Sequence, residues 1–182
     1  MKFLKIIFFL MLTINLASCV GELDFDQAND LEIEPAFSLS LLTLDFSNFD
    51  EETGIILDLT QSPQHTTSAS FDGDNDFFQD NLDSAVFQFE ATNSFPGSFT
   101  MNIVLLDENN LPVFEFQEII IPANTDDFSP EDEEVFVNTN PEILEAQSVV
   151  GVVSYNGSES TTEPGRLTFQ AAGDFYLNIG FD

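Results

Sequence analysis

The chain has 182 residues, of which 33 are acidic and 3 are lysine or arginine, so its formal net charge at neutral pH is −30. Such a charge repels nucleic acids and anionic lipid headgroups, and nucleic-acid binding is therefore excluded. A strongly charged chain can be disordered, but disordered chains are poor in aromatic residues, and this chain contains 21 phenylalanines. The composition indicates a folded domain with an apolar core and an acidic surface.

The N-terminal segment has the pattern of a bacterial export signal. Lys2 and Lys5 flank the start of an uncharged apolar run, residues 6–14, which is too short to cross the ~30 Å hydrocarbon core of a bilayer as a helix. Residues 16–19 then read Leu-Ala-Ser-Cys and resemble the lipobox of bacterial lipoproteins. The resemblance implies cleavage before Cys19, diacylglycerol on its sulfur and acylation of the new amino terminus. The alternative is an ordinary secretory signal in which this cysteine has no role.

The signal divides the chain into three parts. Residues 1–18 are expected to be a removed peptide, 19–35 an acidic tether after the lipidated cysteine, and 36–182 a single domain. Beyond the signal, Arg166 is the only lysine or arginine, and Cys19 is the only cysteine of the chain. An acylated cysteine leaves no thiol for a disulfide, so packing alone must stabilise the domain. Two or three acyl chains hold a protein firmly at a membrane, whereas one holds it reversibly.

Alternation of apolar and polar residues predicts antiparallel strands with one buried face. The clearest run is 99–105, in which Phe, Met, Ile and Leu occupy every second position. About eight or nine strands with short connections predict an all-β antiparallel sandwich, immunoglobulin-like or jelly-roll-like, with a closed barrel as the alternative. The further strands are expected at 37–46, 55–59, 85–92, 113–121, 135–137, 148–155, 167–169 and 175–181.

Several connections have clear turn signals. The polar segment 61–70, which contains a proline, is predicted to be a loop, and Gly173-Asp174 is predicted to be a turn between the last two strands. Residues 107–110 predict a tight hairpin connection. The segments 129–132 and 140–142 each begin with Ser or Asn, then Pro and an acid, which predicts one or two short helical turns.

The densest group of acids lies between residues 72 and 83. Acids stand at relative positions 1, 3, 5, 9 and 12, the spacing of the calcium loop of an EF-hand; they are Asp72, Asp74, Asp76, Asp80 and Asp83. The resemblance departs from that loop at Phe77, where glycine is usual, and at Asp83, where glutamate is usual. No flanking helices are expected, so the segment predicts calcium binding outside an EF-hand proper. The alternative is a solvated acidic loop.

No pattern of residues indicates catalysis. His65, the only histidine, is expected in an exposed loop, and nothing in the sequence supplies a nucleophile elbow or an oxyanion site. Arg166 is expected to pair with a carboxylate near the start of a strand, and a contact with the carboxylate of a ligand is the alternative. The sequence therefore predicts a protein that is not an enzyme.

The chain as a whole resembles small lipoproteins of the Bacteroidota. The features that carry the resemblance are Cys19, the acidic leader at 22–26, strands rich in Phe, Asn and Asp, and the ending at 173–176. It implies lipid anchoring in the outer membrane, on either face. The expected function is a non-catalytic binding or scaffold subunit that docks on an outer-membrane β-barrel or another envelope protein. The alternatives are a small-ligand or lipid-binding sandwich and an envelope hydrolase.

Overall fold

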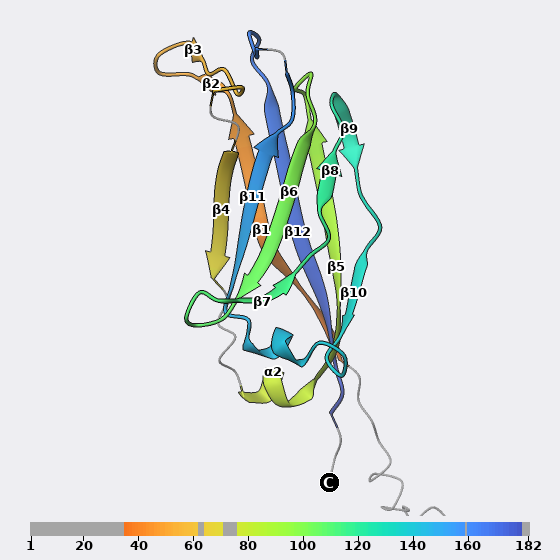
Figure 1. Ribbon diagram of the computed structural model, residues 1–182. Coiled ribbons are helices and arrows are strands. Elements are labelled where there is room, and N and C mark those ends of the chain that lie inside the picture. The colour runs from red at the N-terminus through yellow and green to blue at the C-terminus, as the bar shows by residue number, and fades with distance from the viewer. Residues whose placement is uncertain (1–34, 62–63, 71–75, 159, 180–182) are drawn as a thin grey trace, which may run out of the picture. The chain divides into compact units, whose positions relative to one another are not determined.

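The structure, a computed structural model, describes residues 35–61, 64–70, 76–158 and 160–179. All of these except the last residue belong to one compact unit, residues 34–178 (Figure 1). The expected signal peptide, the lipidation residue and nearly all of the expected tether lie outside the described residues.

Two antiparallel sheets pack face to face as a sandwich, which confirms the predicted fold class (Figure 1). A separate two-stranded ribbon contains β2 (Phe49–Asp50) and β3 (Ile55–Ile56). The first sheet contains β1 (Ala36–Ser47), β12 (Arg166–Leu177), β5 (Leu82–Asn93), β10 (Glu133–Phe136) and β9 (Thr125–Phe128). The second sheet contains β4 (Gln64–Ser70), β11 (Ser148–Tyr155), β6 (Phe99–Leu106), β7 (Pro112–Glu115) and β8 (Ile119–Ile121).

The order of the strands makes the sandwich a jelly roll. β9 and β10 both pair with the edge of β5 that β12 leaves free, and β7 and β8 share the corresponding edge of β6. The sheets therefore have the orders β1-β12-β5-β9/β10 and β4-β11-β6-β7/β8. When β7 with β8 and β9 with β10 are each counted as one interrupted strand, successive strands of the sandwich change sheet except at the β6–β7 hairpin. The first and last strands are neighbours, and the whole order is that of the double Greek key of a jelly roll. The jelly-roll alternative is thus the correct one.

The facing sides of the two sheets form the core. Every apolar residue of the alternation predicted in β6 is buried, and so are Phe87 and Phe89 of β5. The phenylalanine rings contact one another: Phe87 meets Phe116 with 4.7 Å between ring centroids, and Phe89 stacks on Phe169 at 6.1 Å. Such aromatic pairs stabilise a core beyond the area they bury. Core packing therefore accounts for much of the phenylalanine content.

The segment predicted to be a loop at 61–70 contains strand β4. The strand reads Gln-His-Thr-Thr-Ser-Ala-Ser and has no apolar alternation, but its backbone pairs in register with β11, with Thr67 opposite Gly151. Threonine is β-branched and favours extended backbone. Because β4 is an edge strand with one neighbour in its sheet, half of its polar side chains stay exposed. The position in the sheet, and not the pattern of the segment, makes it a strand.

The predicted turn at 173–174 is wrong, because β12 runs unbroken through both residues. Gly173 is required there by space, since a Cβ atom on it would lie 2.9 Å from the ring of Phe175. The carboxylate of Asp174 accepts hydrogen bonds from side chains of β1 and β5. The two residues that predict a turn therefore serve close packing and cross-strand hydrogen bonds.

The register of β1 also differs from the simple alternation expected. A bulge between Ser40 and Leu42 places Leu41 and Leu42 consecutively in the core, while Leu39 is exposed. A bulge inserts one extra residue and reverses the faces of the residues beyond it. The strand predicted at 55–59 is reduced to the short β3.

The predicted helical turns are confirmed at one place. The 3₁₀ turn η2 spans Pro141–Glu145, as its proline and acid signal predicts, whereas residues 129–132 are not helical. The helix α2 (Asp76–Asn81) lies in the segment predicted to be an acidic loop. The strand predicted at 113–121 is divided into β7 and β8.

Asn93 holds the turn that follows β5. Its side chain is fully buried, and its Nδ2 donates to the carbonyls of Gly97 at 2.9 Å and Pro122 at 2.7 Å. Its Oδ1 accepts from the N–H of Phe95 at 2.9 Å. Three backbone groups near the core therefore depend on one amide side chain.

Replacing Asn93 with alanine should lower the free energy of unfolding by about 2–4 kcal/mol, because these backbone groups lose their partners. Asn102, which is exposed on β6, offers a matched control, and Asn102→Ala should change the free energy by less than about 0.5 kcal/mol. Urea denaturation followed by circular dichroism measures both. Equally small effects in the two variants would contradict the role given to Asn93.

Candidate functional site

The acidic segment predicted to bind calcium is only partly described. Asp72 and Asp74 lie outside the described residues, and Asp76 is the first residue of α2. Asp80 is exposed in α2, and Asp83 is exposed at the second position of β5. Within the ranges that the structure describes, no three His, Cys, Asp or Glu side chains are grouped so that they could hold a metal ion. Calcium binding therefore stays a prediction from the sequence.

Arg166 is paired with a carboxylate at a strand start, as predicted. It is the first residue of β12, and its guanidinium donates through Nε and Nη2 to the carboxylate of Asp45 on β1, with 2.7 Å between Nε and Oδ1. These hydrogen bonds hold the pKa of Asp45 below its ordinary value. Both side chains are more than half exposed, so the pair adds little to stability. Because the guanidinium is occupied, the alternative of a ligand contact gains no support.

His65 lies on strand β4, so the exposed loop predicted for it is wrong. Its ring packs against the ring of Phe46 on β1, with 4.0 Å between the centroids. Burial lowers the pKa of the imidazole below its ordinary value, because the charged form is less well solvated there. The contact connects the edge strands of the two sheets, which makes it a packing contact.

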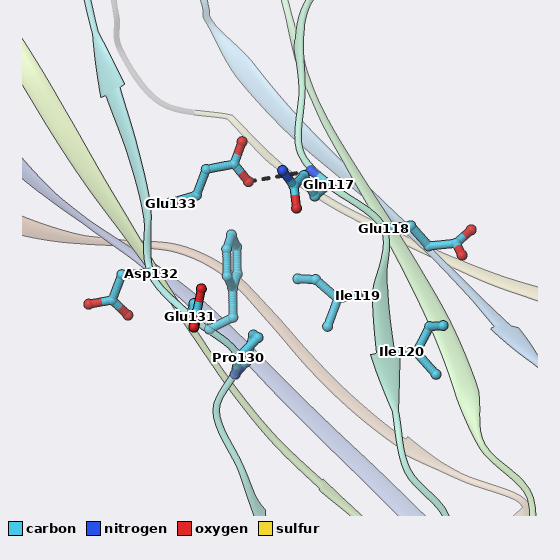
Figure 2. Close-up of a pocket in the computed structure, with 9 residues that line it drawn as sticks. Gln117, Glu118, Ile119, Ile120, Pro130, Glu131, Asp132 and Glu133 are labelled. Carbon is cyan, nitrogen blue, oxygen red and sulfur yellow. Dashed lines mark hydrogen bonds between the residues drawn. The ribbon is translucent and has the colours of Figure 1, made fainter.

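On the opposite side of the sandwich, the free edges of the two sheets are both interrupted. Residues 116–118 separate β7 from β8, and residues 129–132 separate β9 from β10. We call the space between residues 117–120 and 130–133 the seam. An opening of about 270 Å³ lies in the seam, and Phe89 is one of the residues that line it. Figure 2 shows the lining residues of the two segments.

The seam has an apolar floor and an acidic rim. Phe89 and Ile119 line the opening and are buried, whereas Glu118 points away from it (Figure 2). The carboxylate of Glu133 crosses the seam and accepts a hydrogen bond from the backbone N–H of Gln117 at 3.3 Å. The opening is smaller than the roughly 300–1,000 Å³ of usual ligand pockets. The seam is therefore a small recess that repels anions.

Large apolar side chains are exposed at eight described positions. Single exposed apolar residues are normal on protein surfaces, but Phe49, Ile55 and Leu57 lie within nine residues of one another. They belong to the β2–β3 ribbon and the residue after it. The sequence gives no signal for this exposure, because the apolar run at 55–59 predicts a buried strand.

The predicted lipidation residue, Cys19, lies outside the described residues, so lipidation also stays a prediction. None of the helices in the described part of the chain has the length and apolar character needed to cross a membrane.

Comparison with known proteins gives likenesses of fold only. No protein-family model and no curated protein matches the chain. A protein of Parabacteroides distasonis ATCC 8503 that is thought to be secreted is similar at 21% identity and a TM-score of 0.48, over 62% of this chain and 37% of that one. A structure of infectious bursal disease virus, Gx strain, is similar at 14% identity and a TM-score of 0.42, over 81% of this chain and 32% of that one. Desmodium yellow mottle tymovirus gives 12% identity and a TM-score of 0.34, over 84% and 90% of the two chains. All three TM-scores are below 0.5, so the assignment of the fold depends on the strand order itself and no function follows.

Calcium should raise the midpoint of thermal unfolding, because a ligand that binds only the folded state stabilises it, by about 2.7 kcal/mol at a hundred times the Kd. The triple variant Asp72→Asn, Asp74→Asn, Asp76→Asn should lose this shift. Because the net charge is −30, any salt relieves repulsion, and sodium chloride at equal ionic strength is the control. Equal shifts in the two salts would count against a calcium site.

The sole histidine allows a direct titration by NMR, in which His65 should have a lower pKa than a histidine in an unfolded peptide. Because the folded-state pKa is lowered, protonation favours the unfolded chain, so stability falls as the pH drops through the ordinary value of about 6.5. His65→Gln should remove this change between roughly pH 7 and 5, where most carboxylates remain charged. A titration at or above the peptide value would show that the ring is not desolvated.

Proposed function

We propose that this protein is an envelope lipoprotein whose jelly-roll domain is a non-catalytic docking module for an outer-membrane protein or another envelope protein. The resemblance of the leader to a lipobox supports lipidation of Cys19 and a place in the outer membrane. The docking role is supported by two observations: aromatic rings pack against one another in the core, and other large apolar side chains are exposed on the surface.

The observation that carries this proposal is the filled interior. At one end of the core, Phe95 contacts Phe46, Phe99 and Tyr155, with 5.4 to 6.4 Å between ring centroids. At the other end, Phe87 lies edge-on to rings of both sheets. Rings packed in this way fill the space between the sheets in the places where these rings lie. The apolar groups that remain for recognition are on the surface, where another protein can cover them.

The alternative of a small-ligand or lipid-binding domain has less support. It needs a cavity lined by phenylalanine between the sheets, and the rings of Phe87, Phe89 and Phe95 contact other rings instead. An envelope hydrolase needs converging acids or a Ser-His contact in a cleft, and His65 packs on a phenylalanine. Docking through the surface is therefore the better supported function.

Charge and tether together suit a domain that stands away from the bilayer. Without residues 1–18 the chain has 33 acids and one arginine, a net charge of −32, and anionic headgroups repel such a surface. The expected tether, residues 20–35, would span roughly 20 Å on average with the dimensions of a random coil. The domain would then face other envelope proteins and not lipid.

Replacing Cys19 with serine should move the protein from the membrane fraction into the soluble fraction, because the acyl chains then have no point of attachment. Ser18→Ala is the matched control, since it keeps a small residue at the cleavage site, and this variant should stay in the membrane fraction. Immunoblots of fractionated cells measure both. Equal sedimentation of Cys19→Ser and the parent would contradict the anchor.

The docking role has its own readout in the same cells. After extraction of the parent protein in a mild detergent, a native mass measurement should give a value above that of the lipidated monomer. A monomer alone would contradict docking and leave the anchor standing.

A further inference from the structure

The β2–β3 ribbon leaves the sandwich at one end of β1 (Figure 1). Gly54 in its turn has a φ of 67°, and the Gly54 N–H donates to the carbonyl of Asp50 at 2.8 Å. The carboxylate of Asp50 accepts hydrogen bonds from the N–H groups of Glu52 at 2.9 Å and Thr53 at 3.2 Å. The turn is therefore held by its own hydrogen bonds.

The ribbon has apolar side chains on both faces. Phe49 lies opposite Ile56, and Asp50 lies opposite Ile55, so Phe49 and Ile55 point to different faces. Leu57 follows the last residue of β3, and its N–H donates to the carbonyl of Asn48. Phe49, Ile55 and Leu57 are 37%, 55% and 52% exposed. A ribbon of this kind can bury at most one face against its own domain.

A buried asparagine fixes the base of the ribbon to the sandwich. The side chain of Asn48 is fully buried, and its Nδ2 donates to the carbonyls of Leu57 and Glu163, each at 3.2 Å. Its Oδ1 accepts from the N–H of Gly165 at 2.8 Å. The N–H of Leu57 donates to the carbonyl of Asn48 at 2.7 Å. Both ends of the ribbon are thus tied to each other and to the segment before β12.

A second group of hydrogen bonds holds the residues that follow the ribbon. Thr161 is buried, and its hydroxyl donates to the carbonyl of Leu57 at 3.0 Å and accepts from the N–H of Leu59 at 2.9 Å. Asp58 accepts a hydrogen bond from the hydroxyl of Ser160 at 2.6 Å, the main cause that lowers the pKa of Asp58. These hydrogen bonds hold the backbone at the base of the ribbon, next to its exposed apolar side chains.

A fixed and exposed apolar element does not stabilise the isolated domain. Its apolar surface contributes to the free energy of binding only when a partner covers it, at roughly 25 cal/mol per Å² of buried apolar area. An element whose shape is already fixed also loses little conformational entropy on binding. Leu111, which is 60% exposed after the turn between β6 and β7, is the contrast, because the exposed large apolar residue nearest to it in the described sequence is Ile120. The ribbon thus combines three exposed apolar residues with a base held by hydrogen bonds, which suits it for docking.

The charges around the ribbon select its partner. Glu51 and Glu52 are exposed in the turn, and Glu163 is exposed beside the base. Arg166 cannot offset them, because Asp45 occupies its guanidinium. A partner with lysine or arginine beside an apolar slot is complementary to this surface, whereas an anionic bilayer and a second copy of the chain have the same sign of charge.

The place of the ribbon along β1 agrees with a protein partner. The chain enters β1 at Ala36 and reaches the ribbon after Ser47, at the other end of a strand of 12 residues, a length of roughly 40 Å. The ribbon is therefore at the far end of β1 from the residues that connect the domain to its expected tether.

We propose that the β2–β3 ribbon is the docking element of this domain and that it inserts Phe49, Ile55 and Leu57 into an apolar slot of a partner protein whose rim carries lysine or arginine. This inference rests on the docking role proposed above and names the surface used and the chemistry of the partner.

The test uses the full-length protein in intact cells, with the photo-crosslinking residue p-benzoylphenylalanine in place of Leu57 or, as the matched control, in place of Leu111. Light should join the Leu57 variant to one protein, and mass spectrometry of the adduct should place the crosslink in an apolar segment flanked by lysine or arginine. The Leu111 variant should give no adduct. Adding Glu51→Lys and Glu52→Lys to the Leu57 variant should lower the adduct yield about tenfold, because like charges then meet.

Adducts of the Leu57 variant with phospholipid or with a second copy of the chain would overturn the inference, and so would a yield that charge reversal leaves unchanged. Two outcomes would overturn the ribbon as the docking element but leave the docking role standing. One is an adduct at Leu111 without an adduct at Leu57. The other is a native mass above that of the monomer without an adduct at either position. A monomeric native mass and no adduct would overturn both. Thermal unfolding of each variant checks the fold, and Ile55, which is also exposed, is the second crosslinking position.

Discussion

The position of β12 between β1 and β5 is the constraint on which the rest of the jelly roll depends. Phe175 of β12 lies opposite Phe37 of β1 on one side and opposite Ala85 of β5 on the other. Without this strand the first sheet falls into two parts, because β12 is the strand that joins β1 to β5. The first sheet can close only after β12 is available, and such pairing between residues far apart in the sequence is slow.

The sequence predicts well those strands whose two faces have different surroundings. β6 has one face in the core, so its alternation agrees with its burial along the whole strand. β11 also has one buried face, but it is predicted by its β-branched residues, because Val150 and Val152 lie on the less buried face. β4 escapes prediction because its polar residues become a strand only through pairing with β11. Gly173 and Asp174 have the composition of a turn, and only the neighbouring Phe175 ring and the adjacent strands explain them.

The surface chemistry was predictable to a smaller extent. A lone arginine in a very acidic chain is expected to find a carboxylate, but its partner Asp45 is 121 residues away, and no local pattern connects them. The ribbon could not be predicted, because apolar residues at 55–59 are typical of a buried strand. The side chains of Asn48 and Thr161 both donate hydrogen bonds to the carbonyl of Leu57 and so help to set the position of this residue at the surface. Thr161 comes from a distant part of the chain, so no local pattern reveals the contact.

Proteases of the trypsin type cut after lysine or arginine, and beyond Lys5 the chain has one such residue, Arg166. The bond that follows it belongs to β12, where the backbone is paired with strands on both sides and the guanidinium is held by a carboxylate. A protease would have to pull this strand out of the sheet before the bond could enter its active site. The same composition that keeps the domain away from anionic surfaces thus makes the folded protein a poor substrate for digestion by these enzymes.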